Sequence, residues 1–219
     1  MSFFAHLGID PEEVVRLAAR LDHSRTFDVD QHISTSETLT LAQVCEAVSS
    51  ANPPRENLEL TTRDRQLVPQ DEYLPVEAGR IDPGTLERAV SAGATMMITN
   101  VAQWSDELNR FPMSRDASFE VNLFLSGPLC QAYPAHFDLL DAVIIQIVGS
   151  KGWQLWNTLE GGAVDTSTFR TDQFGPPTTS TLLASGDVLL MPARTPHLVA
   201  STFSPSVHLA VAMRDTDAR

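Results

Sequence analysis

The stretch PAHFDLLDAVIIQIVGSKGW, residues 134–153, places two ionisable side chains at the start of an apolar run. Side chains two positions apart in a β-strand point to the same face, so His136 and Asp138 are expected to project together. Residues 142–148 are apolar apart from one glutamine and rich in β-branched residues, which is typical of a buried strand. An imidazole and a carboxylate are therefore expected on one face, just before a buried β-strand.

A lysine follows this run. Gly149 and Ser150 can form a two-residue hairpin turn, after which Lys151 begins a strand and shares a face with Trp153. A lysine inside a barrel is unfavourable unless an anion meets it. The alternative is a hairpin lysine in water, which is where lysine side chains usually lie.

Downstream of residue 93 the sequence has the pattern of a β-structure. Short apolar segments alternate with Gly, Pro, Ser or Asp, and this spacing is typical of sandwiches and barrels, including the jelly rolls of cupins. Only residues 102–111 are predicted to be helical in this part. The predicted strands are residues 94–101, 119–125, 142–148, 151–156, 187–192 and 207–213.

Helices dominate the predicted N-terminal part. One begins at Asp10-Pro11 with acidic residues in its first turn, a second spans residues 36–48, and a third spans residues 82–93. The Pro-rich segment between the last two is interpreted as a connection with short extended pieces. We therefore predict a helical region, residues 1–93, that packs on a β-domain, residues 94–219, as one structural unit.

The composition limits the functions that the chain can have. The 219 residues carry a formal net charge of −13, which disfavours nucleic acid and anionic membranes as partners. No apolar run reaches the ~20 residues needed to cross a bilayer, and acidic residues occur early, where a signal peptide would be apolar. Cys45 and Cys130 are too few for a disulfide framework. We therefore expect a cytoplasmic protein.

A third ligand can come from the segment LLASGDVLLMPARTPHLV, residues 182–199. A strand that ends at a proline and is followed by His197 can return this imidazole to the face of His136 and Asp138. Two histidines and one carboxylate form the facial triad of non-haem Fe(II) oxygenases, and catalytic zinc ions also use three-ligand sites. These residues alone leave iron, zinc and no metal open.

Taken together, the segments resemble the JmjC-type, cupin-fold Fe(II)- and 2-oxoglutarate-dependent oxygenases, especially the bacterial ribosomal-oxygenase-like branch. The resemblance covers roughly residues 93–213 and rests on the H-x-D pair, a D-x-x-x-x-Q segment, the G-x-K-x-W segment and the downstream G-D-x-x-x-x-P-x-x-x-x-H pattern. Each motif is weak alone, whereas the ordered set is specific. The resemblance implies a mainly β fold with N-terminal helices, built as a double-stranded β-helix of the jelly-roll or cupin type.

The resemblance also implies the site residues. In that family the H-x-D pair and a distal histidine hold iron, which carries over to His136, Asp138 and His197 as catalytic and metal-binding residues. The basic residue fifteen positions after the first metal ligand (151 − 136 = 15) binds the remote carboxylate of 2-oxoglutarate, which carries over to Lys151. An asparagine on the preceding strand lines the same pocket, and the matching residue is Asn122.

Two departures from the family pattern are visible. The family commonly has a tyrosine two residues after the pocket asparagine, where this chain has Phe124, and Tyr133 is the candidate to supply a hydroxyl instead. Ribosomal oxygenases continue into a helical dimerisation region and a winged-helix domain, whereas this chain stops at Arg219. The substrate and the oligomeric state are therefore left open.

The implied function is hydroxylation of an unactivated C–H group in an amino-acid-type substrate: a protein or peptide side chain, or an amino-acid-derived metabolite. Fe(II) is the expected cofactor, 2-oxoglutarate and O2 are the cosubstrates, and succinate and CO2 are the coproducts. Two alternatives remain, namely a cupin metalloenzyme that does not use 2-oxoglutarate and a non-catalytic JmjC-like binding module. The sequence does not assign roles to His208, Gln146 and Arg194.

Overall fold

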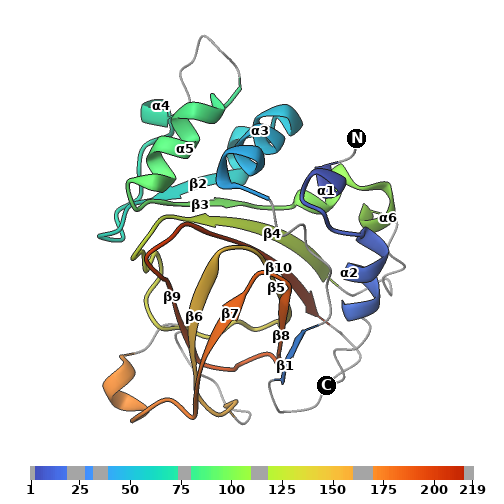
Figure 1. The fold of residues 1–219 in the computed structure, drawn as a ribbon. Helices are drawn as coiled ribbons and strands as arrows, with labels where there is room; N and C mark the ends of the chain where they lie inside the picture. The colour runs from blue at the N-terminus through green and yellow to red at the C-terminus, as the bar shows by residue number, and fades with distance from the viewer. Residues whose placement is uncertain are drawn as a thin grey trace.

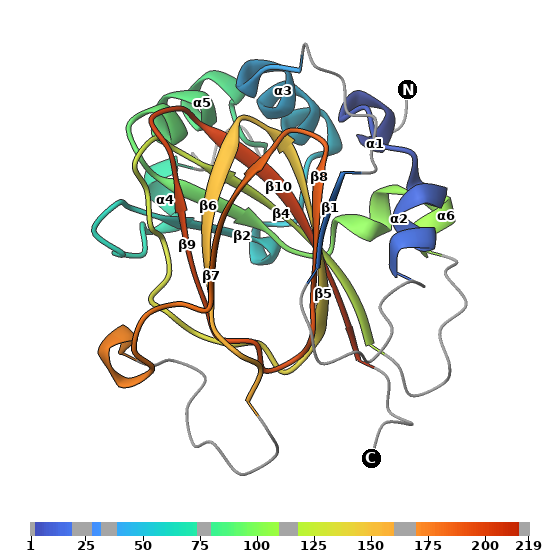
Figure 2. The same cartoon turned by 60° about the horizontal axis from the view of Figure 1, so that its bottom comes forward.

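Two antiparallel β-sheets form the body of the computed structural model, which describes residues 3–18, 28–31, 39–73, 80–109, 118–159 and 170–214. The larger sheet has seven strands in the order β1-β8-β5-β10-β4-β3-β2, and the smaller has three in the order β7-β6-β9. The two sheets face each other (Figures 1 and 2). The predicted mainly β, jelly-roll architecture is thereby confirmed.

The described strands are four to nine residues long, and all of their pairings are antiparallel. The large sheet contains β1 (Asp28–Gln31), β2 (Leu58–Thr61), β3 (Thr95–Ile98), β4 (Ser118–Ser126), β5 (Asp141–Val148), β8 (Asp187–Met191) and β10 (Ser206–Arg214). The small sheet contains β6 (Ser150–Leu155), β7 (Thr179–Ala184) and β9 (His197–Ser201).

The long strands of the large sheet present different side chains to their two faces. On β5, Val143, Ile145 and Ile147 belong to the main hydrophobic core, whereas Ala142 and Ile144 belong to a smaller cluster shared with the small sheet. Strands β4 and β10 alternate in the same way. The outer face of the large sheet therefore builds the core, and its inner face is available for a site.

Helices cover the outer face of the large sheet (Figure 1). Helix α3 begins after Thr40, which forms a capping box with Gln43, and ends at Asn52 in a left-handed conformation. None of the described helices has the length and apolar character needed to span a bilayer. The helices are α1 (Phe3–His6), α2 (Pro11–Ala18), α3 (Leu41–Ala51), α4 (Gln70–Tyr73), α5 (Pro83–Ser91) and α6 (Asp106–Asn109), with 3-10 helices at Arg55–Asn57, Val101–Trp104 and Thr171–Gln173.

Several elements differ from the predicted ones. The helix predicted at 102–111 is divided into a 3-10 helix and α6, because Ser105 between them has an extended backbone. Strand β1 extends the large sheet from the region predicted to be helical, and β7 was not predicted, whereas β2 lies in the connection predicted to contain short extended pieces. Strands β5 and β6 belong to different sheets, so they do not form the hairpin predicted at Gly149-Ser150. The start of the helix predicted at 36–48 lies outside the described residues. The division of the chain at residue 93 stays a prediction.

We expect Gly127→Ala to destabilise the fold. An added Cβ at this buried glycine after β4 would meet the carbonyl oxygen of Val90 and lie 2.6 Å from Gly93 Cα. Both are backbone atoms at the end of α5, so they cannot rotate away, and overpacking of this kind costs about 1–3 kcal/mol. Thermal unfolding should show a lower Tm, by about 2–4 °C for each kcal/mol.

The matched control is Gly152→Ala, because a Cβ there would have its nearest neighbour, the Ala200 carbonyl oxygen, at 3.6 Å. Equal melting temperatures for the two variants would contradict the tight packing assigned to Gly127.

Candidate active site

The structure brings His136, Asp138 and His197 together. The two histidines are neighbours across an isolated β-bridge, in which each backbone N–H donates to the other's carbonyl oxygen, at 3.0 and 2.7 Å. Asp138 Oδ1 lies 4.0 Å from His136 Nε2, and Asp138 Oδ2 lies 3.8 Å from His197 Nε2. One candidate ligand atom from each residue lies within 4.8 Å of the others, so the group could hold a metal ion.

Both imidazoles are oriented by a backbone carbonyl. His136 Nδ1 lies 2.8 Å from the carbonyl oxygen of Pro134, and His197 Nδ1 lies 3.0 Å from that of Thr195. An Nδ1–H that donates to a carbonyl leaves the Nε2 lone pair for a metal. Burial, and next the neighbouring His136, lower the pKa of His197 to about 4, so this ring is neutral at pH 7. The donor set therefore fits a divalent metal ion such as Fe(II).

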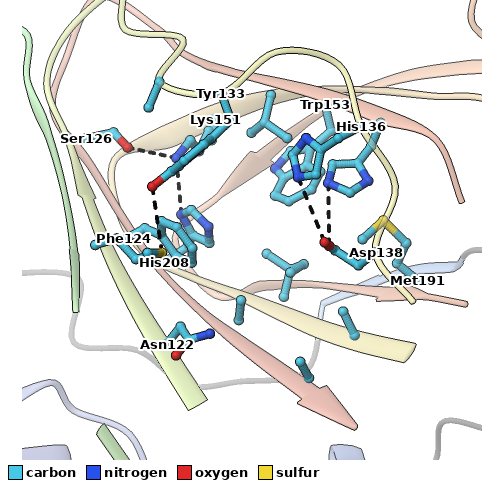
Figure 3. A pocket seen from close by; sticks show the side chains of 18 of the residues that line it. Asn122, Phe124, Ser126, Tyr133, His136, Asp138, Lys151, Trp153, Met191 and His208 are labelled. Atoms are coloured by element: carbon cyan, nitrogen blue, oxygen red, sulfur yellow. Dashed lines mark hydrogen bonds and ion pairs between the residues drawn. The ribbon is translucent and has the colours of Figure 1, made fainter. Parts of the chain in front are cut away.

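The three side chains line a cavity of about 500 Å³, a volume typical of small-molecule sites. Its walls come from both sheets, namely from β3, β4, β5, β8 and β10 on one side and from β6 and β9 on the other. Leu139, which is 58% exposed, lies at the rim beside Asp138. Figure 3 shows His136 and Asp138 at one end of the cavity and Lys151, Ser126 and His208 at the other.

Lys151 is the only lysine among the 219 residues, and it is buried, with 5% of its surface exposed. Its Nζ donates to Ser126 Oγ at 2.8 Å and lies 3.3 Å from His208 Nδ1. Burial lowers the pKa of Lys151 to about 7, and the neighbouring Cys130 opposes this shift. Among the residues that the structure describes, no carboxylate forms an ion pair with this lysine. The inner end of the cavity is therefore basic, with no carboxylate partner for Lys151 in the part of the chain that the structure describes.

Asn122 and Tyr133 both line the cavity. Asn122 Oδ1 accepts a hydrogen bond from the Asn100 backbone N–H at 3.1 Å, which leaves the amide NH2 group available. The Tyr133 hydroxyl donates to Glu59 Oε1 at 2.8 Å, and burial followed by Glu59 raises the Tyr133 pKa above its usual value. The hydroxyl thus has a partner on β2, and its expected role as a cosubstrate ligand stays a prediction.

Ser126 and His208 are cavity residues that sequence reasoning did not place in the site. Ser126 lies on β4 with Asn122 and Phe124, so the two-residue period of that strand was a signal for it. His208 is the register partner of Phe124, but this pairing joins strands far apart in the sequence. Strand periodicity could therefore have found Ser126, whereas His208 required the sheet order.

Gln146 and Arg194 have structural partners. The Gln146 side-chain nitrogen donates to the Val148 carbonyl oxygen and to Ser206 Oγ, both at 2.8 Å. Arg194 has a left-handed backbone, with φ of 64°, and its Nε donates to the Leu159 carbonyl oxygen at 3.4 Å. Neither side chain lines the cavity.

Comparison with known proteins gives a family match. The JmjC domain model matches residues 95–219. The bifunctional lysine-specific demethylase and histidyl-hydroxylase NO66 of Drosophila willistoni is 28% identical over 127 residues, which cover 54% of this chain and 17% of that protein. Ribosomal oxygenase 2 of Mus musculus is 29% identical over 124 residues, covering 54% of this chain and 27% of that protein. The chain spans less than a third of the length of these relatives.

Solved structures of YcfD from Escherichia coli have a similar fold. One has a TM-score of 0.60 at 16% identity and covers 93% of this chain and 53% of that chain. Another, the ribosomal oxygenase YcfD in complex with cobalt and 2-oxoglutarate, has a TM-score of 0.58 at 15% identity, with coverages of 93% and 52%. At such identities the likeness concerns the fold alone.

We expect Lys151→Met to stabilise the ligand-free protein near neutral pH. The lysine pKa is about 7 in the folded chain against an ordinary value of 10.5. Between these values the unfolded chain binds a proton that the folded chain does not, so the free energy of unfolding of the wild type rises with pH. The loss of stability caused by burying the ammonium group is fully present below the pKa of Lys151 in the folded chain. Methionine, which is similar in length but uncharged, removes this loss.

The measurement is Tm at about pH 6.5 and about pH 9.5, where the advantage of the variant should be larger at the lower pH. A variant that melts below the wild type at the lower pH would contradict the penalty assigned to the buried ammonium.

Proposed function

The chain belongs to the JmjC domain family, and from this premise we propose that it is an Fe(II)- and 2-oxoglutarate-dependent oxygenase. One observation carries the proposal: Lys151 is buried without an anionic partner among the described residues, in the cavity that also holds the three candidate metal ligands. A dicarboxylate that spans the cavity would supply this anion. The solved relative that binds cobalt and 2-oxoglutarate supports this choice of ligand.

Fe(II) would be held by His136, Asp138 and His197. The bound centre would supply oxidation of a C–H bond by O2, coupled to the conversion of 2-oxoglutarate into succinate and CO2. The carbonyl oxygens of Pro134 and Thr195 fix the two imidazoles through Nδ1, so both Nε2 atoms are presented in the form that binds a metal.

Lys151 would neutralise the remote carboxylate of 2-oxoglutarate. On β6 it lies four residues before Leu155, about 13 Å along the strand, and Leu155 is the register partner of His197. Lys151 and the three candidate metal ligands are thus separated along the strand, and a ligand with an acid group at each end can contact both. Trp153, which lies between them and is 3% exposed, contributes an apolar wall that excludes water and strengthens these charge interactions.

The substrate that we propose is an amino-acid side chain in a protein or peptide, or an amino-acid-derived metabolite, hydroxylated at an unactivated carbon. The names of the relatives, a histidyl-hydroxylase and a ribosomal oxygenase, support a protein substrate. The location that we propose is the cytoplasm, as the sequence predicts.

Turnover tests the reaction class. Protein loaded with Fe(II) should convert 2-oxoglutarate and O2 into succinate and CO2. Asp138→Ala should reduce this rate by more than about tenfold, because mutation of a residue that only hydrogen-bonds to a metal ligand already has an effect of that size. Oxygen consumption that continues without 2-oxoglutarate would favour a cupin metalloenzyme of another kind. A chain that binds neither the metal nor 2-oxoglutarate would favour a non-catalytic binding module.

Lys151→Ala should bind 2-oxoglutarate about 100-fold more weakly, because removal of one partner of a buried ion pair is strongly unfavourable. Its metal affinity should stay unchanged, since Lys151 contacts none of the three metal-ligand candidates. Isothermal titration of both proteins with 2-oxoglutarate and with Mn(II) measures the two affinities. Equal 2-oxoglutarate affinities of the wild type and Lys151→Ala would show that Lys151 does not bind this ligand.

The affinity for 2-oxoglutarate should also fall with rising pH. The ammonium form of Lys151 binds the carboxylate, and its pKa in the ligand-free chain is about 7. Above that pH, binding requires proton uptake, so the Kd should rise by up to about tenfold per pH unit. Titrations between about pH 7 and pH 9 should show this slope in the wild type and a flat profile in Lys151→Ala.

A further inference from the structure

His208 lies beside Lys151 and Ser126 at the inner end of the cavity, and we call these three residues the basic end. It is in the middle of β10, with Phe124 of β4 and Gln146 of β5 as register partners. It is 4% exposed, and its ring stacks on that of Phe124 with centroids 4.8 Å apart and 3° between the planes. Figure 3 shows His208 and Lys151 pointing toward each other.

Two basic groups meet at this end without an acidic one. His208 Nδ1 lies 3.3 Å from Lys151 Nζ. Burial lowers the pKa of both side chains, and Lys151 lowers that of His208 further. The groups that face the pair are the Ser126 hydroxyl, the Cys130 thiol and the rings of Phe124 and Trp153, and none of these described neighbours is a carboxylate. A bound anion would favour the charged forms of these side chains and so offset the effect of burial on their pKa values.

When Lys151 is charged, its contact with His208 determines where the imidazole proton lies. An ammonium group has three N–H donors and no acceptor, so a charged Lys151 can only donate to Nδ1. The neutral imidazole then carries its proton on Nε2, on the opposite side of the ring from Nδ1. Because His208 lines the cavity, this N–H is a donor for a ligand.

We propose that His208 donates a hydrogen bond from Nε2–H to the remote carboxylate of 2-oxoglutarate, beside the ammonium of Lys151. The inference rests on the proposed function, because it takes that dicarboxylate as the ligand. Phe124 stands where the resembling family commonly has a tyrosine. Its ring brings no donor, but it stacks on the imidazole that has one. His208 is thus a binding residue, and Phe124 is the residue that positions it.

Two substitutions of His208 separate its two nitrogens. In His208→Asn the side-chain oxygen can replace Nδ1 as the acceptor for Lys151, but no group reaches the place of Nε2. In His208→Gln the side-chain NH2 group can replace the Nε2–H donor. Loss of a hydrogen bond to a charged group corresponds to a drop in affinity of about 10- to 100-fold, and we expect this loss in His208→Asn and a smaller one in His208→Gln.

The experiment is isothermal titration of the Mn(II)-loaded wild type, both His208 variants and Lys151→Ala with 2-oxoglutarate. The control ligand is 2-oxopentanoate, which has the same carbon chain but lacks the remote carboxylate. Its affinity should be the same in His208→Asn as in the wild type. Melting curves and Mn(II) titrations of each variant verify that it is folded and metal-competent.

A His208→Asn variant that binds 2-oxoglutarate as tightly as the wild type, or no more weakly than His208→Gln, overturns the role of His208. If Lys151→Ala still loses affinity in that case, the proposed function stands without this donor. A wild type that does not bind 2-oxoglutarate at all overturns both the proposed function and this inference.

Discussion

Every second side chain of an antiparallel strand points to the same face, and the rest of this structure depends on that constraint. On β4, β5 and β10, one set of alternate residues forms the apolar core beneath the helices, and the other set lines the cavity. One sheet thus serves two environments without interrupting the main core. A shift of one residue in register would exchange the two sets. The pairing that stabilises the fold is therefore the pairing that builds the site.

The two ends of the cavity have opposite electrostatic character. Asp138 lies between two imidazoles at the metal end, whereas Lys151 lies beside a third imidazole at the basic end. Burying the basic pair is unfavourable, and the core on the outer side of the large sheet offsets it. Functional sites often keep such local destabilisation. A ligand that fills both ends would bind the folded chain alone and so raise its stability by mass action.

The motif set in the sequence was sufficient for the family and the architecture, because strand alternation and the order of the motifs are local properties. The JmjC domain match and the two-sheet fold confirm both. Contacts between distant segments could not be read in this way. The partner of the Tyr133 hydroxyl is Glu59, a residue of β2 in the N-terminal region. The place of His208 follows from β10 lying between β4 and β5, and sequence spacing does not specify that order. Ser105 divides the helix predicted at 102–111, although the apolar pattern continues past it.

The single, buried lysine gives the folded chain an unusual surface chemistry. Arginine accounts for every basic side chain other than Lys151 and the histidines. Amine-directed reagents such as succinimidyl esters would therefore reach the ε-amine only from within the cavity, where the lowered pKa leaves more of it as the nucleophilic free base than in an exposed lysine. Acylation at that position would report on cavity occupancy, because a bound ligand would shield the amine, whereas unfolding would expose it.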